Sequence, residues 1–176
     1  MKRTITIITT LVITIGIDQW TKVLAVDHLK NKIGESYLDG FFRFIYAENT
    51  GAFLGQGDGL SPTASFWILK ILPMVVLLGL LAYLFFSKEL DRVSTMAFAL
   101  IVGGGLSNVA DRFLNNGAVV DFMNMAIGDL RTGIFNFADV FIMIGVGLML
   151  VTQFWPKKKV EVESETVKDS SGITLP

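Results

Sequence analysis

The chain has 176 residues, of which 52% are hydrophobic, and a formal net charge of −1 at pH 7. It contains no cysteine and one histidine, His28, which excludes a disulfide framework, a thiol nucleophile and a metal site built from cysteine or from histidine alone. The mean hydropathy of +0.57 comes from separate apolar blocks, a distribution that is typical of a membrane protein.

Residues 4–26 are expected to form the first membrane-spanning helix, because about 20 apolar residues cross a hydrocarbon core of ~30 Å. The basic start at Lys2 and Arg3 is also typical of a cleavable signal peptide, but no small-x-small cleavage site follows. We therefore expect an uncleaved helix that begins in the cytoplasm. Asp18 then lies about 20 Å along this helix, near its outer end.

Residues 27–65 are too polar to cross a membrane and are expected to form short strands and turns. Aromatic residues and glycines are interspersed between Ile33 and Gly57, which favours a small sheet, or β-cradle, on the outer membrane surface. The segment ends near Asn49 and Gly51, a pair that could simply form a turn.

Two further spans are expected at residues 66–86 and 93–113. Pro73 is expected to kink the first of them, as membrane helices tolerate. Lys88 and Arg92 lie in the turn between the two spans and fit a cytoplasmic location.

The span at residues 93–113 carries two rows of residues at a spacing of four. One row is small and would let another helix approach closely: Ala99, Gly103 and Ser107. The neighbouring row is Gly104, Asn108 and Arg112, and Asp111 is expected on the same side. The polar groups all lie in the last turns, toward the outer face.

The last span is expected at residues 135–155. Asp121 lies in the segment 117–122, which a short polar connection separates from this span, and it is expected where two membrane helices meet the same membrane face. Asn136 and Asp139 are three residues apart on this span and so share a face. Lys157, Lys158 and Lys159 keep the following segment in the cytoplasm, and the charged residues 157–176, which are acidic and turn-rich from 160 on, are expected to form a disordered tail.

The sequence thus predicts an α-helical integral membrane protein with four transmembrane helices and a small β-cradle inserted between the first two. Residues 1–156 would form its single membrane domain, with both termini in the cytoplasm. This topology brings four acids to one membrane face: Asp18, Asp111, Asp121 and Asp139. Their convergence predicts one polar site at the outer surface.

Asp121 and Asp139 are the candidates for chemistry, because an acid at a membrane interface is costly to keep. Desolvation and like-charge repulsion favour a pair that shares one proton. One carboxylate could then take a proton from water while the other protonates an amide carbonyl. The residues alone leave open a small proton-coupled transporter that uses the acids as relays, and an assembly factor whose acids only satisfy Arg112 and Asn108.

The chain resembles the lipoprotein signal peptidases, or signal peptidase II family, over nearly its whole length up to about Trp155. The resemblance rests on five motifs in the family's order: Ile17–Lys22, Glu48–Phe53, Gly105–Arg112, Val119–Phe122 and Phe135–Asp139.

This resemblance implies an aspartyl endopeptidase of the bacterial inner membrane with its active site toward the periplasm. Its substrates would be diacylglyceryl-modified prolipoproteins, cut just before the lipid-modified cysteine to release the signal peptide. It would need no metal or other cofactor, would be inhibited by the cyclic peptide globomycin, and would have membrane lipids but no nucleic acid as partners. We expect a monomer, with a mobile helix of the outer loop covering the cleft.

The resemblance also implies roles for individual residues. Asp121 and Asp139 match the catalytic pair. The residues expected to contact the substrate or to support the site are Asn49, Gly51, Asn108, Arg112, Asn136, Asp18, Lys22 and Asp111.

Overall fold

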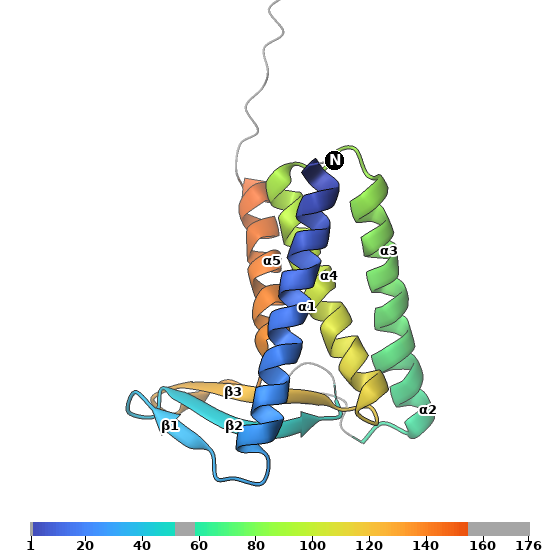
Figure 1. Cartoon of the computed structure of the whole chain (residues 1–176). Helices are drawn as coiled ribbons and strands as arrows, with labels where there is room; N and C mark the ends of the chain where they lie inside the picture. The colour runs from blue at the N-terminus through green and yellow to red at the C-terminus, as the bar shows by residue number, and fades with distance from the viewer. Residues whose placement is uncertain (1, 52–58, 155–176) are drawn as a thin grey trace, which may run out of the picture.

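The computed structural model describes residues 2–51 and 59–154, with four helical rods side by side and a small sheet across one end of them (Figure 1). The rods are α1 (Lys2–Leu29), a continuous rod of α2 (Pro62–Ser65), η2 (Phe66–Ile71) and α3 (Leu72–Phe86), then α4 (Arg92–Leu114) and α5 (Phe137–Phe154). The chain starts at the end of the bundle away from the sheet. The tail expected at residues 157–176 lies outside the described residues.

Three rods are long and apolar enough to cross a membrane, namely Lys2–Leu29, Pro62–Phe86 and Arg92–Leu114. The fourth contains the shorter apolar stretch Phe137–Thr152. Large apolar side chains on all four rods are exposed, for example Val12, Val75, Met96 and Met143. Apolar surface of this extent is typical of a protein surrounded by lipid. The crossing of α5 remains a prediction.

Pro73 is accommodated by a widened helical turn. Proline has no N–H to donate and its ring crowds the preceding turn of an α-helix. Directly before it, η2 is a π-helix, in which the backbone N–H of Leu72 bonds the carbonyl of Trp67. The irregularity expected at Pro73 therefore takes the form of a π segment, one of the recognised causes of helix bending.

The sheet is antiparallel, with strands in the order β1 (Glu35–Tyr37), β2 (Phe42–Asn49), β3 (Val119–Ile127) and β4 (Leu130–Arg131). β1 and β2 come from the expected cradle segment, but β3 and β4 come from the chain between α4 and α5. The prediction of a cradle contained between the first two spans was therefore wrong. The loop in which a covering helix was expected includes residues 52–58, which lie outside the described part.

β3 was missed because its sequence does not alternate between polar and apolar residues. All of its first six residues are buried, so both faces of the strand are covered. A strand buried on both faces need not alternate, and here apolar residues stand on both sides of Asp121: Val119, Val120 and Phe122. Asp121 consequently lies within a central strand, opposite Ala47 of β2, and not at the end of a membrane helix.

Small residues set the spacing between the rods. A Cβ atom added at Gly104 of α4 would lie 2.5 Å from the carbonyl oxygen of Ala138, and one added at Gly103 would lie 3.0 Å from the Cβ of Thr14. Real Cβ atoms do not approach a carbonyl so closely, so only glycine at position 104 lets α5 begin directly against α4. This contact places the first turn of α5 beside the middle of α4.

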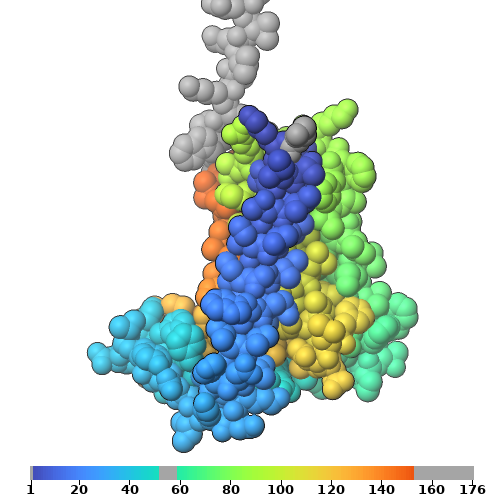
Figure 2. Space-filling view, in the orientation of Figure 1, coloured from blue at the N-terminus to red at the C-terminus, as the bar shows by residue number. Residues whose placement is uncertain are grey.

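Two apolar clusters hold the bundle at its opposite ends. The first is centred on Ile7, Leu84, Ala99 and Val102 of α1, α3 and α4. The second lies between the end of α1 and the sheet and is centred on Ala25, Val120, Phe122 and Met123. Figure 2 shows α1 running down the middle of one face, with part of the sheet extending to one side beyond the rods.

Candidate active site

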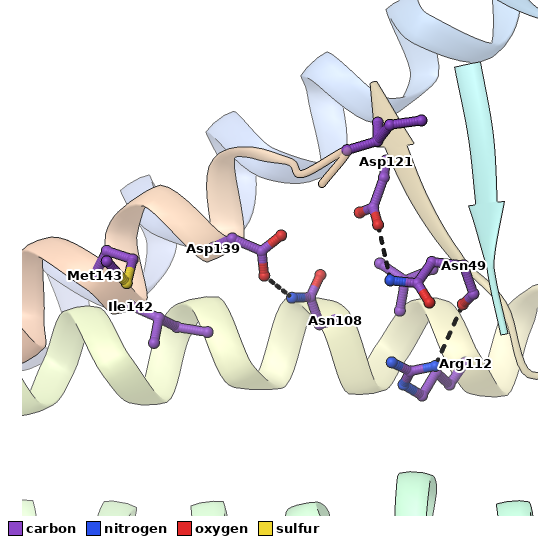
Figure 3. Close-up of a pocket in the computed structure, with 9 residues that line it drawn as sticks. Asn49, Asn108, Arg112, Asp121, Asp139, Ile142 and Met143 are labelled. Carbon is purple, nitrogen blue, oxygen red and sulfur yellow. Dashed lines mark hydrogen bonds between the residues drawn. The ribbon is translucent and has the colours of Figure 1, made fainter. Parts of the chain in front are cut away.

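A cavity of about 400 Å³ opens where the sheet meets α4 and α5 (Figure 3). Its walls come from β2, α4, β3, the segment after β4, and α5. They are formed by Asn49, Asn108, Arg112, Val119, Asp121, Ile134, Asp139, Ile142 and Met143. Both candidate carboxylates therefore line one cavity, although they come from different elements.

Asp121 is fixed by amides on both sides. The Nδ2 of Asn49 on β2 donates to its Oδ2 at 3.0 Å, and the Nδ2 of Asn136 donates to its Oδ1 at 2.7 Å. The pairing of β2 with β3 makes the first bond possible, because it sets Asn49 opposite Val119, two residues from Asp121.

The environment of Asp121 raises the pKa of its carboxyl group to about 7. Burial is the largest cause, since the side chain is only 3% exposed and desolvation disfavours the charged form. The bond from Asn49 opposes this rise, and the negative charge of Asp139 adds to it. Asp121 therefore exchanges a proton close to neutral pH, as a general acid or base requires.

Asp139 is held by the start of α5 through a reciprocal cap. Asn136 precedes the helix, and its Oδ1 accepts the backbone N–H of Asp139 at 3.0 Å. The Oδ2 of Asp139 accepts the backbone N–H of Asn136 at 3.2 Å. This capping box fixes the carboxylate at the first turn of the helix, and the Nδ2 of Asn108 binds its other oxygen at 3.0 Å.

Asn136 and Asn108 connect the two carboxylates. Asn136 is fully buried and bonds Asp121 through its side chain and Asp139 through its backbone. Its Nδ2 also donates to the Oδ1 of Asn108 at 3.0 Å. The two asparagines therefore fix the positions of both acids relative to each other.

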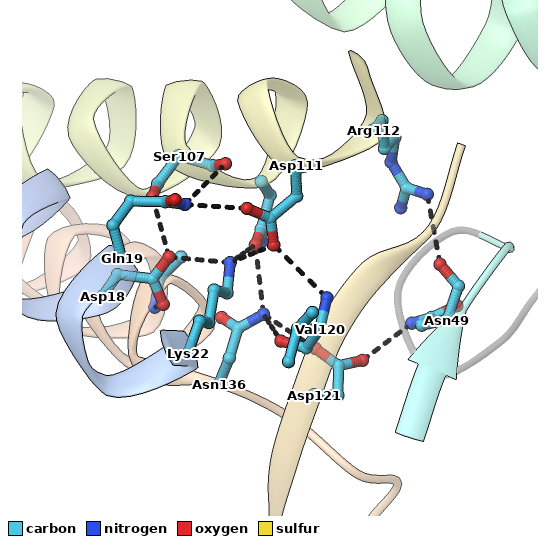
Figure 4. Close-up of polar contacts among 12 residues, drawn as sticks. Asp18, Gln19, Lys22, Asn49, Ser107, Asp111, Arg112, Val120, Asp121 and Asn136 are labelled. Atoms are coloured by element: carbon cyan, nitrogen blue, oxygen red, sulfur yellow. Dashed lines mark hydrogen bonds and ion pairs between the residues drawn. The ribbon is translucent and has the colours of Figure 1, made fainter. Parts of the chain in front are cut away.

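Behind this pair lies a buried ionic cluster around Lys22 (Figure 4). Its Nζ lies 2.7 Å from Asp18 and 2.9 Å from Asp111, and it donates to the Oδ1 of Asn108 at 2.9 Å. Asp18 also accepts the backbone N–H of Ala138 at 2.8 Å, and Asp111 accepts that of Val120 at 3.2 Å. The cluster thus ties α1 and α4 to the start of α5 and to β3.

Arg112 holds the end of β2 rather than an acid. Its Nη2 donates to the carbonyl of Gly51 at 2.7 Å, and its Nη1 donates to that of Gly117 at 3.1 Å. The N–H of Gly51 bonds the Oδ1 of Asn49 at 3.1 Å, the geometry of an Asx turn. The turn expected at this point is therefore present, and the same asparagine lines the cavity.

All ten residues expected in the site meet in this region. Two further residues, Gln19 and Ser107, also belong to it and were not predicted from the sequence. The Nε2 of Gln19 donates to Asp111 at 2.7 Å and to Ser107 at 3.0 Å, and the hydroxyl of Ser107 donates to Asp18 at 2.7 Å. Ser107 was expected only as a small packing residue. The position of Gln19 directly after Asp18, in an otherwise apolar helix, was the available signal.

Within residues 2–51 and 59–154, no group of three or more His, Cys, Asp or Glu side chains is placed to hold a metal ion. The described cavity is lined by two carboxylates that can transfer protons, together with two amides and a guanidinium.

The family model and the related proteins that match this chain agree on one family. The family described as signal peptidase (SPase) II matches residues 10–155. The lipoprotein signal peptidase of Borrelia turicatae (strain 91E135) is 33% identical over 149 residues, covering 81% of this chain and 85% of the relative. That of Microcystis aeruginosa (strain NIES-843 / IAM M-2473) is 38% identical over 152 residues, covering 85% and 92%.

Two solved structures described as bacterial membrane enzymes have the same fold. One has a TM-score of 0.73 at 27% identity and covers 86% of this chain and 94% of its own. The other has a TM-score of 0.70 at 30% identity and covers 85% and 87%. The matched residues include all five motifs, and the chain therefore belongs to the signal peptidase II family, a family of membrane peptidases.

Proposed function

We propose that this protein is an aspartyl endopeptidase that removes the signal peptide from diacylglyceryl-modified prolipoproteins, cutting just before the lipid-modified cysteine. Family membership supports the processing of prolipoproteins. One observation carries the mechanism: Asp121 of β3 and Asp139 of α5 line the same cavity and are joined by Asn136.

The two carboxylates act as a pair that holds one proton. Asp121, with a pKa of about 7, carries that proton on an oxygen facing the scissile carbonyl, and Asp139 accepts a proton from the attacking water. As water's oxygen bonds the carbonyl carbon, Asp121 gives its proton to the carbonyl oxygen, and a tetrahedral gem-diol forms. The proton on Asp139 then passes to the leaving nitrogen as the C–N bond breaks, and Asp121 takes a proton back from the diol as the carboxylic acid forms. No covalent enzyme intermediate is formed.

The other site residues position these acids or the substrate. Asn49 and Asn108 each hold one carboxylate through a side-chain amide. Arg112 fixes the end of β2 and borders the cavity, where it can bind a substrate carbonyl. The ionic cluster of Lys22 keeps the elements that carry the acids in register.

In the proposed topology all four rods cross the bacterial inner membrane, both termini are cytoplasmic, and the sheet lies on the periplasmic surface. The apolar exposure of the rods and the position of the sheet at one end of them support this arrangement. A substrate anchored by its lipid would then reach the cavity by lateral diffusion in the outer leaflet.

A proton-coupled transporter is an alternative function that the positions of the acids support less well than a peptidase. A relay across the membrane needs acids at several depths. The buried acids of the described residues are Asp18, Asp111 and Asp121, and hydrogen bonds tie each of them to the region where the rods meet the sheet. This distribution fits one interfacial site.

The test compares Asp121→Asn and Asp139→Asn with Asp129→Asn, a change of an exposed acid in the turn between β3 and β4. With a purified protein and a diacylglyceryl lipobox peptide, the kcat of each of the first two variants should fall by about 10²–10⁴-fold. This is the usual contribution of general acid–base catalysis to the rate. Asp129→Asn should cleave at the wild-type rate. Wild-type cleavage by Asp139→Asn would exclude the proposed pair.

A further inference from the structure

A second groove, which the proposed chemistry does not use, lies beside the catalytic cavity. It has a volume of about 500 Å³ and is almost entirely apolar. It runs between β3, the segment before α5, and the first turns of α5. Its walls are formed by Met125, Thr132, Gly133, Phe135, Asp139, Val140, Met143 and Ile144.

The groove shares only Asp139 and Met143 with the catalytic cavity. These two residues are four apart on α5 and so form a ridge along the helix. At about 100° per residue, Ile142 lies roughly 60° to one side of Asp139, whereas Val140 and Ile144 lie roughly 100–140° to the other. Two apolar paths therefore diverge from one catalytic carboxylate.

The polar groups of the second groove are already satisfied. The backbone N–H of Met125 donates to the hydroxyl of Thr132 at 3.0 Å, and the Nδ2 of Asn124 donates to the carbonyl of Thr132 at 2.6 Å. Apart from Asp139 on the ridge, the described walls carry one polar side chain, that of Thr132, which bonds β3. The catalytic cavity is instead lined by the polar side chains of Asn49, Asn108 and Arg112.

The groove is closed by the core on its inner side and open on its outer side. Phe135 and Val140 pack against the cluster beneath the sheet, so the floor is part of the core. Met143 and Ile144 are 63% and 47% exposed on the surface that faces lipid in the proposed topology. A chain lying in the groove could therefore continue directly into the hydrocarbon.

A lipid-modified substrate has two apolar arms at its cleavage site. The signal peptide lies on one side of the scissile bond, and the acyl chains hang from the cysteine sulfur on the other. The arm made of peptide needs hydrogen-bonding partners, and the arm made of hydrocarbon needs none. We propose that the second groove binds an acyl chain of the substrate's diacylglyceryl group, with Met143 separating it from the signal peptide in the catalytic cavity.

This assignment rests on the proposed function and predicts that the groove selects for acyl chain length. Ile144→Trp would fill the groove from its exposed edge, and Leu150→Trp, on the exposed surface of the same helix but outside the groove, is the matched control. Each variant would be given the same lipobox peptide carrying either two 16-carbon or two 4-carbon acyl chains.

Ile144→Trp should raise KM for the 16-carbon substrate about tenfold, the usual effect of misfitting a methylene or two in an apolar site. Its kcat, and both constants for the 4-carbon substrate, should stay within about twofold of wild type. Equal effects of Ile144→Trp and Leu150→Trp would mean that bulk lipid alone fills the groove. Equal loss for both substrates would mean that the groove takes the peptide arm, and either result overturns the proposal.

A second measurement does not depend on the folding of any variant. A substrate with a photoreactive diazirine at the end of one acyl chain should label the wild-type peptide that contains Val140 and Ile144. Labelling only of the exposed surface of α3, around Val75 and Val76, would refute the assignment. A wild type that cleaves neither substrate would instead refute the proposed function itself.

Discussion

Replacement of Lys22 by methionine tests whether the buried ionic cluster holds the site together. Lys22 is 3% exposed, and its Nζ lies 2.7 Å from Asp18 and 2.9 Å from Asp111. Methionine keeps much of the side-chain volume but removes the positive charge. Two buried carboxylates are then left without their shared cation.

The expected loss of stability is large because the buried charges cannot reach water. At an effective dielectric constant of about 20, each of the two contacts corresponds to roughly 6 kcal/mol of attraction. Desolvation of the charged groups offsets much of this, and removal of one partner from a buried ion pair usually costs about 3–5 kcal/mol. For a chain of this size, such a loss lowers the melting temperature by on the order of 10 °C.

Lys30→Met is the matched control. Lys30 lies just beyond α1, and its Nζ is 2.9 Å from Glu48, but the two side chains are 45% and 50% exposed. Water and salt screen such an exposed pair, so this variant should melt within about 3 °C of wild type.

The assay is thermal unfolding of the purified variants in one detergent, followed by tryptophan fluorescence. Adding Asp18→Asn to Lys22→Met should recover part of the lost stability, because it removes one of the uncompensated charges. Equal melting temperatures for the two single lysine variants would show that the cluster does not stabilise the bundle.

Three further results are expected. Gly104→Ala should destabilise the protein by about 1–3 kcal/mol through its clash with the carbonyl of Ala138, whereas Gly79→Ala, which meets nothing within 4 Å, should be neutral or slightly stabilising in the same melting assay. The rate of cleavage should fall about tenfold per pH unit above about 7, as Asp121 loses the proton that the pair needs; a flat kcat/KM profile up to pH 9 would contradict the pKa of about 7. Arg112→Lys should lower cleavage, because an ammonium group cannot replace the guanidinium fork that binds Gly51 and Gly117; unchanged kinetics would show that this fork is dispensable.

The helical part of the fold was readable from the sequence because each span is a long apolar block with clear ends. The third span, expected at 93–113, is α4 at Arg92–Leu114. Asn136 and Asp139 do lie beside each other, but a reciprocal cap brings them together and not a shared helical face, because Asn136 precedes the helix. The start of the last span was placed two residues early because Asn136 caps the helix instead of entering it.

The sheet was readable only in part, because β3 is covered on both faces and lacks alternation. Contacts between elements were harder still. Nothing in the sequence says that Lys22 reaches Asp111 of another helix, since that contact depends on the rotation of α1 against α4. The close approach of α4 and α5 at Gly104 likewise fixes a geometry that periodicity alone leaves open.

One cleavage assay tests whether the two carboxylates cleave the substrate without a metal. Purified wild type, with and without a metal chelator, and Asp139→Asn would each be given a diacylglyceryl lipobox peptide, with the products identified by mass spectrometry. We expect a cut just before the modified cysteine that the chelator leaves unchanged and that Asp139→Asn abolishes. Cleavage that stops with the chelator, or that persists in Asp139→Asn, would contradict it.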